Sequence, residues 1–209
     1  MYSGITRGLH RVVSVEPREG ATRFSVQLPR ELREGAELGA SIAIDGVCLT
    51  VVAIEGERVS FDAVAETLAL TTLSDLHVGR EVSVERSCKV GDELGGHDVF
   101  GHVIGTGRVL ATQLKGAQLD LTIGVPEAWM KFILHKGFIA LDGSSLTVDE
   151  PSKDSFVVHV IPETQRLTNF AKKKVGDRVN VELDSRTVAV VQTVERVMAE
   201  REREREAKR

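Results

Sequence analysis

Residues 42–51 read Ile-Ala-Ile-Asp-Gly-Val-Cys-Leu-Thr-Val, and residues 139–148 read Ile-Ala-Leu-Asp-Gly-Ser-Ser-Leu-Thr-Val. The same offset of 97 carries Glu66-Thr67 onto Glu163-Thr164 and Val84-Glu85 onto Val181-Glu182. Without a gap, 16 of the 47 positions from 41 to 87 match their partners. This period is too long for a solenoid repeat and fits one small domain. The chain is therefore a tandem duplication, and the positions where the copies differ are the candidates for function.

Both copies show the pattern of short β-strands. In the first copy, apolar residues alternate in 12–15, 24–28 and 80–85, and β-branched residues fill 41–52 and 58–64 on either side of a hairpin signal at 55–57. The second copy repeats the scheme at 117–123, 138–148, 155–161 and 178–183. Such strands fit a barrel or a sandwich, and a closed barrel suits a domain this small because it has no exposed strand edges.

Short helices are predicted inside the copies, and a longer helix follows them. The short ones are expected at 29–33, 65–68 and 126–135, the last with a proline at its start. From about residue 187, apolar residues at 190, 191, 194, 197 and 198 have helical spacing, and Asp184 or Ser185 can cap this helix. Its apolar stripe predicts contact with other copies of the chain, whereas the charged tail is expected to fray. The predicted domains are 1–97, 98–186, and a helix with its tail at 187–209.

Composition narrows the class of protein. The chain has 209 residues, 42% apolar and 28% charged, as in ordinary globular proteins. It has no apolar run of roughly 18–20 residues and no signal-peptide core, so a cytoplasmic protein without a membrane partner is expected. The net charge of −4 argues against nucleic acid, and the lysines at 172–174 are interpreted as a solvated turn rather than a phosphate site. Cys48 and Cys88 have no metal-site spacing and are expected to be reduced thiols, with no role assigned to Cys88.

The two copies differ in chemistry at four pairs of positions. With the first copy named first, the pairs are Cys48 and Ser145, Ser87 and Asp184, Ile5 and His102, and Gly39 and Lys136. Similar folds with complementary polar groups suggest two similar pockets that hold similar ligands in unequal roles.

Two segments are candidates for the walls of these pockets. In a strand, Cys48 and Thr50 point to one face and Val47 and Leu49 to the other, which fits either a polar pocket wall or a structural Ser/Thr ladder. Ser145 and Thr147 repeat this geometry in the second copy.

The junction at 95–102 reads Gly-Gly-His-Asp-Val-Phe-Gly-His. Its paired glycines allow close approach to a ligand or a sharp turn. His97 and His102 can transfer protons near neutral pH, but no further ligand completes a metal set. The structural alternative is a turn between the copies with exposed histidines.

These motifs resemble the riboflavin synthase family over the whole chain. The resemblance rests on Met-Tyr-Ser-Gly-Ile, Gly-Val-Cys-Leu-Thr-Val, Gly-Gly-His-Asp-Val-Phe-Gly-His-Val, Lys-Gly-Phe-Ile-Ala-Leu-Asp-Gly-Ser-Ser-Leu-Thr-Val and Ile-Pro-Glu-Thr. It implies an all-β fold, a tandem duplication of two six-stranded Greek-key barrels with short helices and a C-terminal α-helix that forms a homotrimer. The implied active site lies between the N-terminal barrel of one subunit and the C-terminal barrel of the next.

The resemblance also implies the reaction. Two molecules of 6,7-dimethyl-8-ribityllumazine undergo dismutation to riboflavin and 5-amino-6-(D-ribitylamino)uracil, the last step of riboflavin biosynthesis. One molecule donates a four-carbon unit to the other, and neither a cofactor nor a metal takes part. Two identical substrates in unequal roles fit two similar pockets with different chemistry.

Site residues follow by correspondence with the family motifs. The implied catalytic residues are Cys48 as nucleophile or polar ligand group, His102 as proton shuttle with His97 nearby, Ser145 in the second pocket, and Asp184 as an orienting or protonating group. The implied substrate-binding residues are Gly4, Ile5, Thr6, Cys48, Leu49, Thr50, Asp62, Ala63, Val64, Ala65, Glu66, Thr67, Gly101, His102, Val103, Lys136, Ser145, Leu146, Thr147, Ile161, Pro162, Glu163, Thr164, Gln165 and Arg166.

The chain departs from the family pattern near its start and at the first repeat motif. Tyr2 and Ser3 replace the usual Phe and Thr, and the added phenol needs a hydrogen-bond partner. Asp45, often Asn in the family, is expected to add a charge near the first pocket.

Other functions are possible for such a chain. Some relatives bind lumazine or flavin without catalysis and serve as antenna proteins in bioluminescence. They tend to lose the catalytic polar groups, which this chain keeps at Cys48, His97, His102, Ser145 and Asp184. A duplicated barrel used for transport or interaction is the third interpretation.

Overall fold

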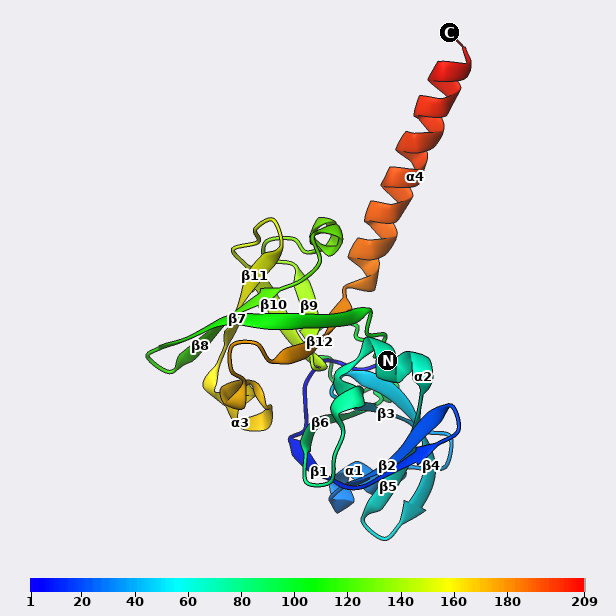
Figure 1. The fold of residues 1–209 in the computed structure, drawn as a ribbon, viewed down its shortest axis with the longest axis vertical. Coiled ribbons are helices and arrows are strands. Elements are labelled where there is room, and N and C mark those ends of the chain that lie inside the picture. Colours follow the sequence, from blue (N-terminus) through cyan, green and yellow to red (C-terminus); the bar gives the residue numbers. More distant parts are fainter. Residues whose placement is uncertain (209) are drawn as a thin grey trace.

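The computed structural model describes residues 1–208 as two closed, six-stranded antiparallel barrels followed by a long helix (Figure 1). The first barrel contains β1 (Leu9–Arg18), β2 (Ala21–Gln27), β3 (Ser41–Ile44), β4 (Val47–Glu55), β5 (Arg58–Val64) and β6 (Glu81–Arg86). The second contains β7 (Gly105–Lys115), β8 (Gln118–Gly124), β9 (Phe138–Leu141), β10 (Ser144–Asp149), β11 (Ser155–Val160) and β12 (Arg178–Leu183).

Both barrels have the same topology. The order around the first is β1-β2-β5-β4-β3-β6, and the second repeats it as β7-β8-β11-β10-β9-β12. In each, three consecutive strands form a meander and the preceding strand returns beside the last of them, which is a Greek key. The predicted all-β tandem duplication is confirmed.

Seven helical segments connect or follow these strands within residues 1–208. The α-helices are α1 (Arg30–Arg33), α2 (Ala65–Leu70), α3 (Pro162–Leu167) and α4 (Ser185–Ala207), and the 3-10 helices are η1 (Thr72–Asp75), η2 (Glu127–Phe132) and η3 (Phe170–Lys172). The predicted helix at 126–135 was too long, because the chain turns at Ile133 and buries that side chain in the second core. The lysine run was also not wholly solvated, since Lys173 is only 11% exposed and pairs with Asp142.

Each repeated Asp-Gly pair forms a two-residue hairpin turn. The φ angles are 45° and 78° at Asp45-Gly46, and 43° and 82° at Asp142-Gly143. These left-handed values match the twist of the flanking strands and favour Asp and Gly. The predicted alternation in β4 is confirmed, because Val47 and Leu49 are buried whereas Cys48 is half-buried and Thr50 exposed.

The two barrels meet about a local two-fold axis that relates equivalent residues. Tyr2 N donates to Val99 O at 2.6 Å, and Val99 N donates back to Tyr2 O at 3.1 Å. The Asp-Gly turns also meet face to face, since a Cβ on Gly46 would lie 2.4 Å from Gly143 N. A side chain at either glycine would force the barrels apart, so the joint tolerates no larger residue there.

Asp45 lies in this joint, which corrects the expectation that it adds charge near the first pocket. Its side chain is fully buried, accepting a hydrogen bond from Ser83 N at 2.7 Å and pairing with Arg80 at 2.7 Å. Its equivalent Asp142 pairs with Lys173 at 3.0 Å. Burial and the nearby Asp142 carboxylate raise the pKa of Asp45 to about 6.

Helix α4 leaves the second barrel and projects away from both barrels (Figure 1). Asp184 caps it, as predicted, by accepting a hydrogen bond from Thr187 N at 2.9 Å. The expectation of a frayed tail was wrong, because the helix continues to Ala207; Arg209 lies outside the described residues. No helix within residues 1–208 is both long and apolar enough to cross a membrane.

We predict that Asp45→Asn changes how stability depends on pH. Because the folded-state pKa of Asp45 is raised above its unfolded value of 3.8, ionisation of this group weakens folding as pH rises through about 6. Asparagine has no such ionisation. The free energy of unfolding of the variant, relative to that of the original chain, should therefore rise between about pH 4 and 6 and stay level above, by on the order of 2–3 kcal/mol. The exposed Asp154→Asn serves as control, and parallel curves for the original chain and Asp45→Asn would contradict the account.

Candidate functional site

In each barrel, one pair of neighbouring strands is paired over only part of its length, and the two strands then diverge. β4 pairs with β5 from Glu55/Arg58 to Val51/Phe61, beyond which β5 continues along β2. In the second barrel, β10 and β11 pair at Val148/Val158 and Asp149/Val157 before they diverge. We call residues 47–50 with 62–64 the first opening, and residues 144–147 with 159–161 the second opening. The predicted binding residues on these strands therefore lie where the pairing of the barrel ends.

The first opening holds Cys48 between two segments from outside the strands. Cys48 N donates to Gly101 O at 3.0 Å, and the Tyr2 hydroxyl donates to Cys48 Sγ at 3.1 Å. Burial, followed by the bond to Cys48, raises the pKa of Tyr2 well above its usual range, so the phenol stays protonated and remains a donor. The phenol that replaces the usual phenylalanine thus has its partner. His102 follows Gly101 and is exposed, with its ring centroid 6.1 Å from that of Phe100.

The second opening has the same backbone contact but different side chains. Ser145 N donates to Gly4 O at 2.8 Å, and His97 Nδ1 lies 2.6 Å from Ser145 Oγ. The His97 ring stacks on Phe138 with centroids 5.0 Å apart. Burial lowers the pKa of His97, although the negative charges of Asp184 and Asp98 act against this shift. A neutral imidazole in contact with a hydroxyl can accept its proton, so this pair is suited to acid–base chemistry.

Glycines are required where the two crossing segments touch the strands. Both Gly4 and Gly101 have φ of 76°, which favours glycine. A Cβ on Gly101 would lie 2.5 Å from Cys48 Cβ, and one on Gly4 would lie 2.6 Å from Ser145 Cβ. The contact of each segment with its strand therefore depends on the absence of a side chain.

Two buried glutamates hold these glycine segments, and sequence reasoning did not assign them a role. Glu85 accepts hydrogen bonds from Ser3 N at 2.7 Å and Gly4 N at 3.1 Å. Glu182 accepts from Phe100 N at 2.7 Å and Gly101 N at 2.9 Å. Burial raises the pKa of both carboxyls, and the backbone donors oppose that shift. The repeat contained a signal for this role. A glutamate recurs at the offset of 97 on a strand in which valines occupy alternate positions.

The predicted histidines belong to different openings. His97 contacts Ser145 in the second opening, whereas His102 adjoins the Gly101 contact in the first. The expectation that His97 lies near His102 therefore has no support in the ring contacts of either residue. Asp184 caps α4, and burial opposes its ionisation, but hydrogen bonds from Thr187 outweigh burial and lower its pKa.

The remaining predicted residues complete the openings or lie next to them. Residues 62–64 end β5 and 65–67 begin α2, while 161 follows β11 and 162–166 lie in α3. Val64 and Ile161 occupy equivalent positions before these helices and are more than half exposed. Such apolar side chains suit contact with a flat ring. Asp62 and Lys136 are held by Arg23 and Asp149, at 2.7 Å and 3.0 Å.

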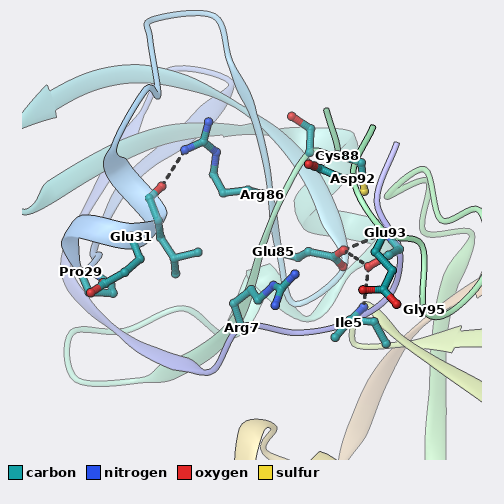
Figure 2. Close-up of a pocket in the computed structure, with 13 residues that line it drawn as sticks. Ile5, Arg7, Pro29, Glu31, Glu85, Arg86, Cys88, Asp92, Glu93 and Gly95 are labelled. Atoms are coloured by element: carbon teal, nitrogen blue, oxygen red, sulfur yellow. Dashed lines mark hydrogen bonds between the residues drawn. The ribbon is translucent and has the colours of Figure 1, made fainter. Parts of the chain in front are cut away.

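A separate cavity of about 780 Å³ opens beside the first barrel (Figure 2). It is lined by Ser3, Ile5, Arg7, Pro29, Glu31, Leu32, Glu85, Arg86, Ser87, Cys88, Asp92, Glu93 and Gly95. Of the predicted site residues, Ile5 lines it. Arg86 spans its wall to bind Leu32 O at 3.0 Å, and Glu85 faces the start of the chain (Figure 2). The cavity therefore borders the glycine segment, and the two openings lie elsewhere.

Comparison with known proteins agrees with this geometry. The lumazine binding domain model matches residues 3–87 and 100–184, one copy in each barrel. The chain is 46% identical to riboflavin synthase of Escherichia coli (strain K12) over 203 residues, covering 97% of this chain and 95% of that one. It is 41% identical to riboflavin synthase of Chlamydia muridarum (strain MoPn / Nigg), covering 96% and 98%.

Solved structures of LumP show the same fold. The complex with riboflavin has a TM-score of 0.82 and 27% identity, covering 88% of this chain and all of LumP. The complex with 6,7-dimethyl-8-(1'-D-ribityl) lumazine has a TM-score of 0.80 and 26% identity with the same coverage. With two lumazine binding domains and these relatives, the chain belongs to the riboflavin synthase family.

Proposed function

We propose that the chain is a riboflavin synthase, which converts two molecules of 6,7-dimethyl-8-ribityllumazine into riboflavin and 5-amino-6-(D-ribitylamino)uracil. The observation that carries the proposal is the pair of equivalent openings with unequal chemistry. One presents the thiol of Cys48 beside Tyr2, and the other presents Ser145 beside His97. A reaction that consumes two identical molecules in different roles needs such a pair. The identity of 46% to a named synthase and the ligands of LumP support the same conclusion.

Each opening would bind one lumazine ring over its outer face. In the first, the Cys48 sulfur could add to an electrophilic ring carbon, and the Tyr2 hydroxyl would support negative charge on that sulfur. In the second, the neutral His97 ring could take a proton through Ser145. Holding the two rings face to face could lower the barrier by roughly 7–11 kcal/mol through proximity alone. His102 would carry protons at the first opening, and Asp184 would orient groups at the second through its charge on His97.

The active chain would be a homotrimer joined through α4. Val190, Val194, Val197 and Met198 recur on this helix and are 38–64% exposed. An apolar stripe of this kind is stabilised by burial against another helix. Trimer formation would bring the first opening of one subunit against the second opening of the next, with domains at 1–97, 98–186 and 187–209. The unpaired thiols of Cys48 and Cys88 fit a reducing compartment such as the cytoplasm.

We expect the purified chain to form riboflavin from 6,7-dimethyl-8-ribityllumazine without an added cofactor, measured by flavin absorbance. Cys48→Ala should lower turnover by at least about tenfold, on the scale of one lost transition-state interaction. Cys88→Ala is the matched control, because Cys88 is also half-buried and lies outside both openings. Tight lumazine binding without riboflavin would instead favour a non-catalytic lumazine-binding protein. Equal losses in the two variants would exclude the role of Cys48.

We expect removal of residues 188–209 to convert the trimer into smaller species, measured by sedimentation at several concentrations. The reason is that the deletion removes the exposed apolar stripe and keeps every buried core residue of both barrels, while Val188 is lost from the edge of the second core. Replacing the surface pair Lys153 and Glu127 with alanine provides a control outside the helix. A trimer that survives the deletion would show that another surface joins the subunits.

A further inference from the structure

Equivalent positions beside the two openings carry opposite charges. On the first barrel, Arg23 of β2 faces Asp62 of β5, with two hydrogen bonds of 2.7 Å. The offset of 97 places Asp120 of β8 and His159 of β11 at these positions on the second barrel. There, His159 Nδ1 lies 2.6 Å from Asp120 Oδ1. On the first barrel the basic residue is on β2 and the acidic one on β5, the strand that borders the opening. On the second barrel the basic residue, His159, is on the bordering strand β11.

A second carboxylate completes the environment of His159. Its Nε2 atom lies 3.0 Å from Asp149 Oδ2, so both ring nitrogens face carboxylate oxygens. Only the imidazolium cation can donate from both nitrogens, so two facing carboxylates favour the protonated form of His159. The bonds to Asp120 and Asp149 raise the pKa of His159, and the bonds of Asp120 to Lys115 and His159 hold that carboxyl at a pKa of about 2.

Further charged groups surround this cluster. Lys136 Nζ lies 3.0 Å and His135 Nδ1 3.2 Å from oxygens of Asp149, and Lys115 Nζ lies 2.7 Å from Asp120. The Gln118 amide donates to Asp120 Oδ1 at 2.6 Å. Glu150 adds a further negative charge near Lys115, so the cations and carboxylates of the cluster are equal in number. The cations His159 and Lys136 are the ones that border the second opening. On the first barrel, the Arg23 charge balances that of Asp62.

The charged residues occupy the same place relative to each opening. Thr147 and His159 are the first residues beyond the last pair of β10 and β11, Val148/Val158. Thr50 and Asp62 are likewise the first beyond the last pair of β4 and β5, Val51/Phe61. Each charged residue thus enters its opening at the same position, on the strand facing that of the threonine.

Lys136 is held at a strained position within the same cluster. Its φ is 59°, whereas the equivalent Gly39 reaches 87° without a side chain to hinder it. This left-handed region disfavours residues that carry a Cβ. Glycine forms the same turn in the first copy, so the turn itself does not require lysine. What lysine adds is the ion pair between its ammonium group and Asp149.

We propose that the second opening binds the lumazine molecule that loses a methyl proton, and that His159 is the positioning residue that sets this preference. The proton passes through Ser145 to the neutral His97 ring, and the remaining negative charge spreads over the lumazine ring and its oxygens. His159 fixes Asp149, which in turn holds the Lys136 ammonium beside the opening. The cations His159 and Lys136 beside the second opening stabilise the anion, whereas the Asp62 carboxylate gives the first opening no such advantage. This inference rests on the proposed function and assigns unequal roles to its two sites.

The test follows ionisation of bound 6,7-dimethyl-8-ribityllumazine by stopped-flow absorbance from pH 6 to 10. The full-length protein is in excess, and spectra are recorded before turnover. Relative to the original chain, His159→Gln and Lys136→Gln should each raise the midpoint, lowering the ionisation constant of the bound ligand about threefold to tenfold. Lys153→Gln removes an exposed cation from the same barrel and should leave the midpoint unchanged. Lys136 is exposed, so its variant tests the proposal even if His159→Gln fails to fold.

Two results would overturn the proposal. One is a midpoint that stays the same in the original chain, in Lys136→Gln and in folded His159→Gln. The other is a shift caused by Asp62→Asn with no shift in His159→Gln or Lys136→Gln, which would place the anion in the first opening. A normal titration without any riboflavin formed by the original chain would refute the proposed enzyme function and leave the charge assignment standing.

Discussion

The close contact between the Gly46 and Gly143 turns is the constraint on which the rest of the molecule depends. Each turn has the left-handed geometry that ends a tight hairpin, and each lacks a side chain where the other approaches. Together with the reciprocal hydrogen bonds of Tyr2 and Val99, the contact fixes the local two-fold axis. The buried Asp45 and Asp142 lie in the same joint, and each pairs with one cation. Any side chain that separated the turns would also disturb both openings.

The two-fold arrangement means that each opening contains parts of both copies. Gly101 precedes the second barrel but contacts Cys48 of the first, and Gly4 precedes the first barrel but contacts Ser145 of the second. Neither barrel alone therefore forms a complete opening. The exchange also lets the copies diverge in chemistry while the backbone contacts stay equivalent, so that a thiol stands in one and a hydroxyl with a histidine in the other.

The sequence was a good guide to features that depend on local pattern. Period-two alternation located most strands, and the repeat fixed the equivalence of Cys48 and Ser145. It did not find β7, whose outer half is exposed on both faces and so lacks alternation. The sequence also misplaced Asp45 and led us to expect His97 near His102. Long-range contacts decide what a turn residue or a junction residue packs against, and the sequence pattern does not contain them. The charge inversion at Asp62 and His159 was visible in the repeat, but its meaning required the strand register.

The central claim is that two equivalent openings in one chain each bind a lumazine ring. Calorimetric titration of the full-length Cys48→Ala variant, expected to turn over slowly, with 6,7-dimethyl-8-ribityllumazine tests it most directly. The account predicts two molecules bound per chain, with different affinities because the side chains and charges of the openings differ. A single molecule bound per chain at saturation would contradict it.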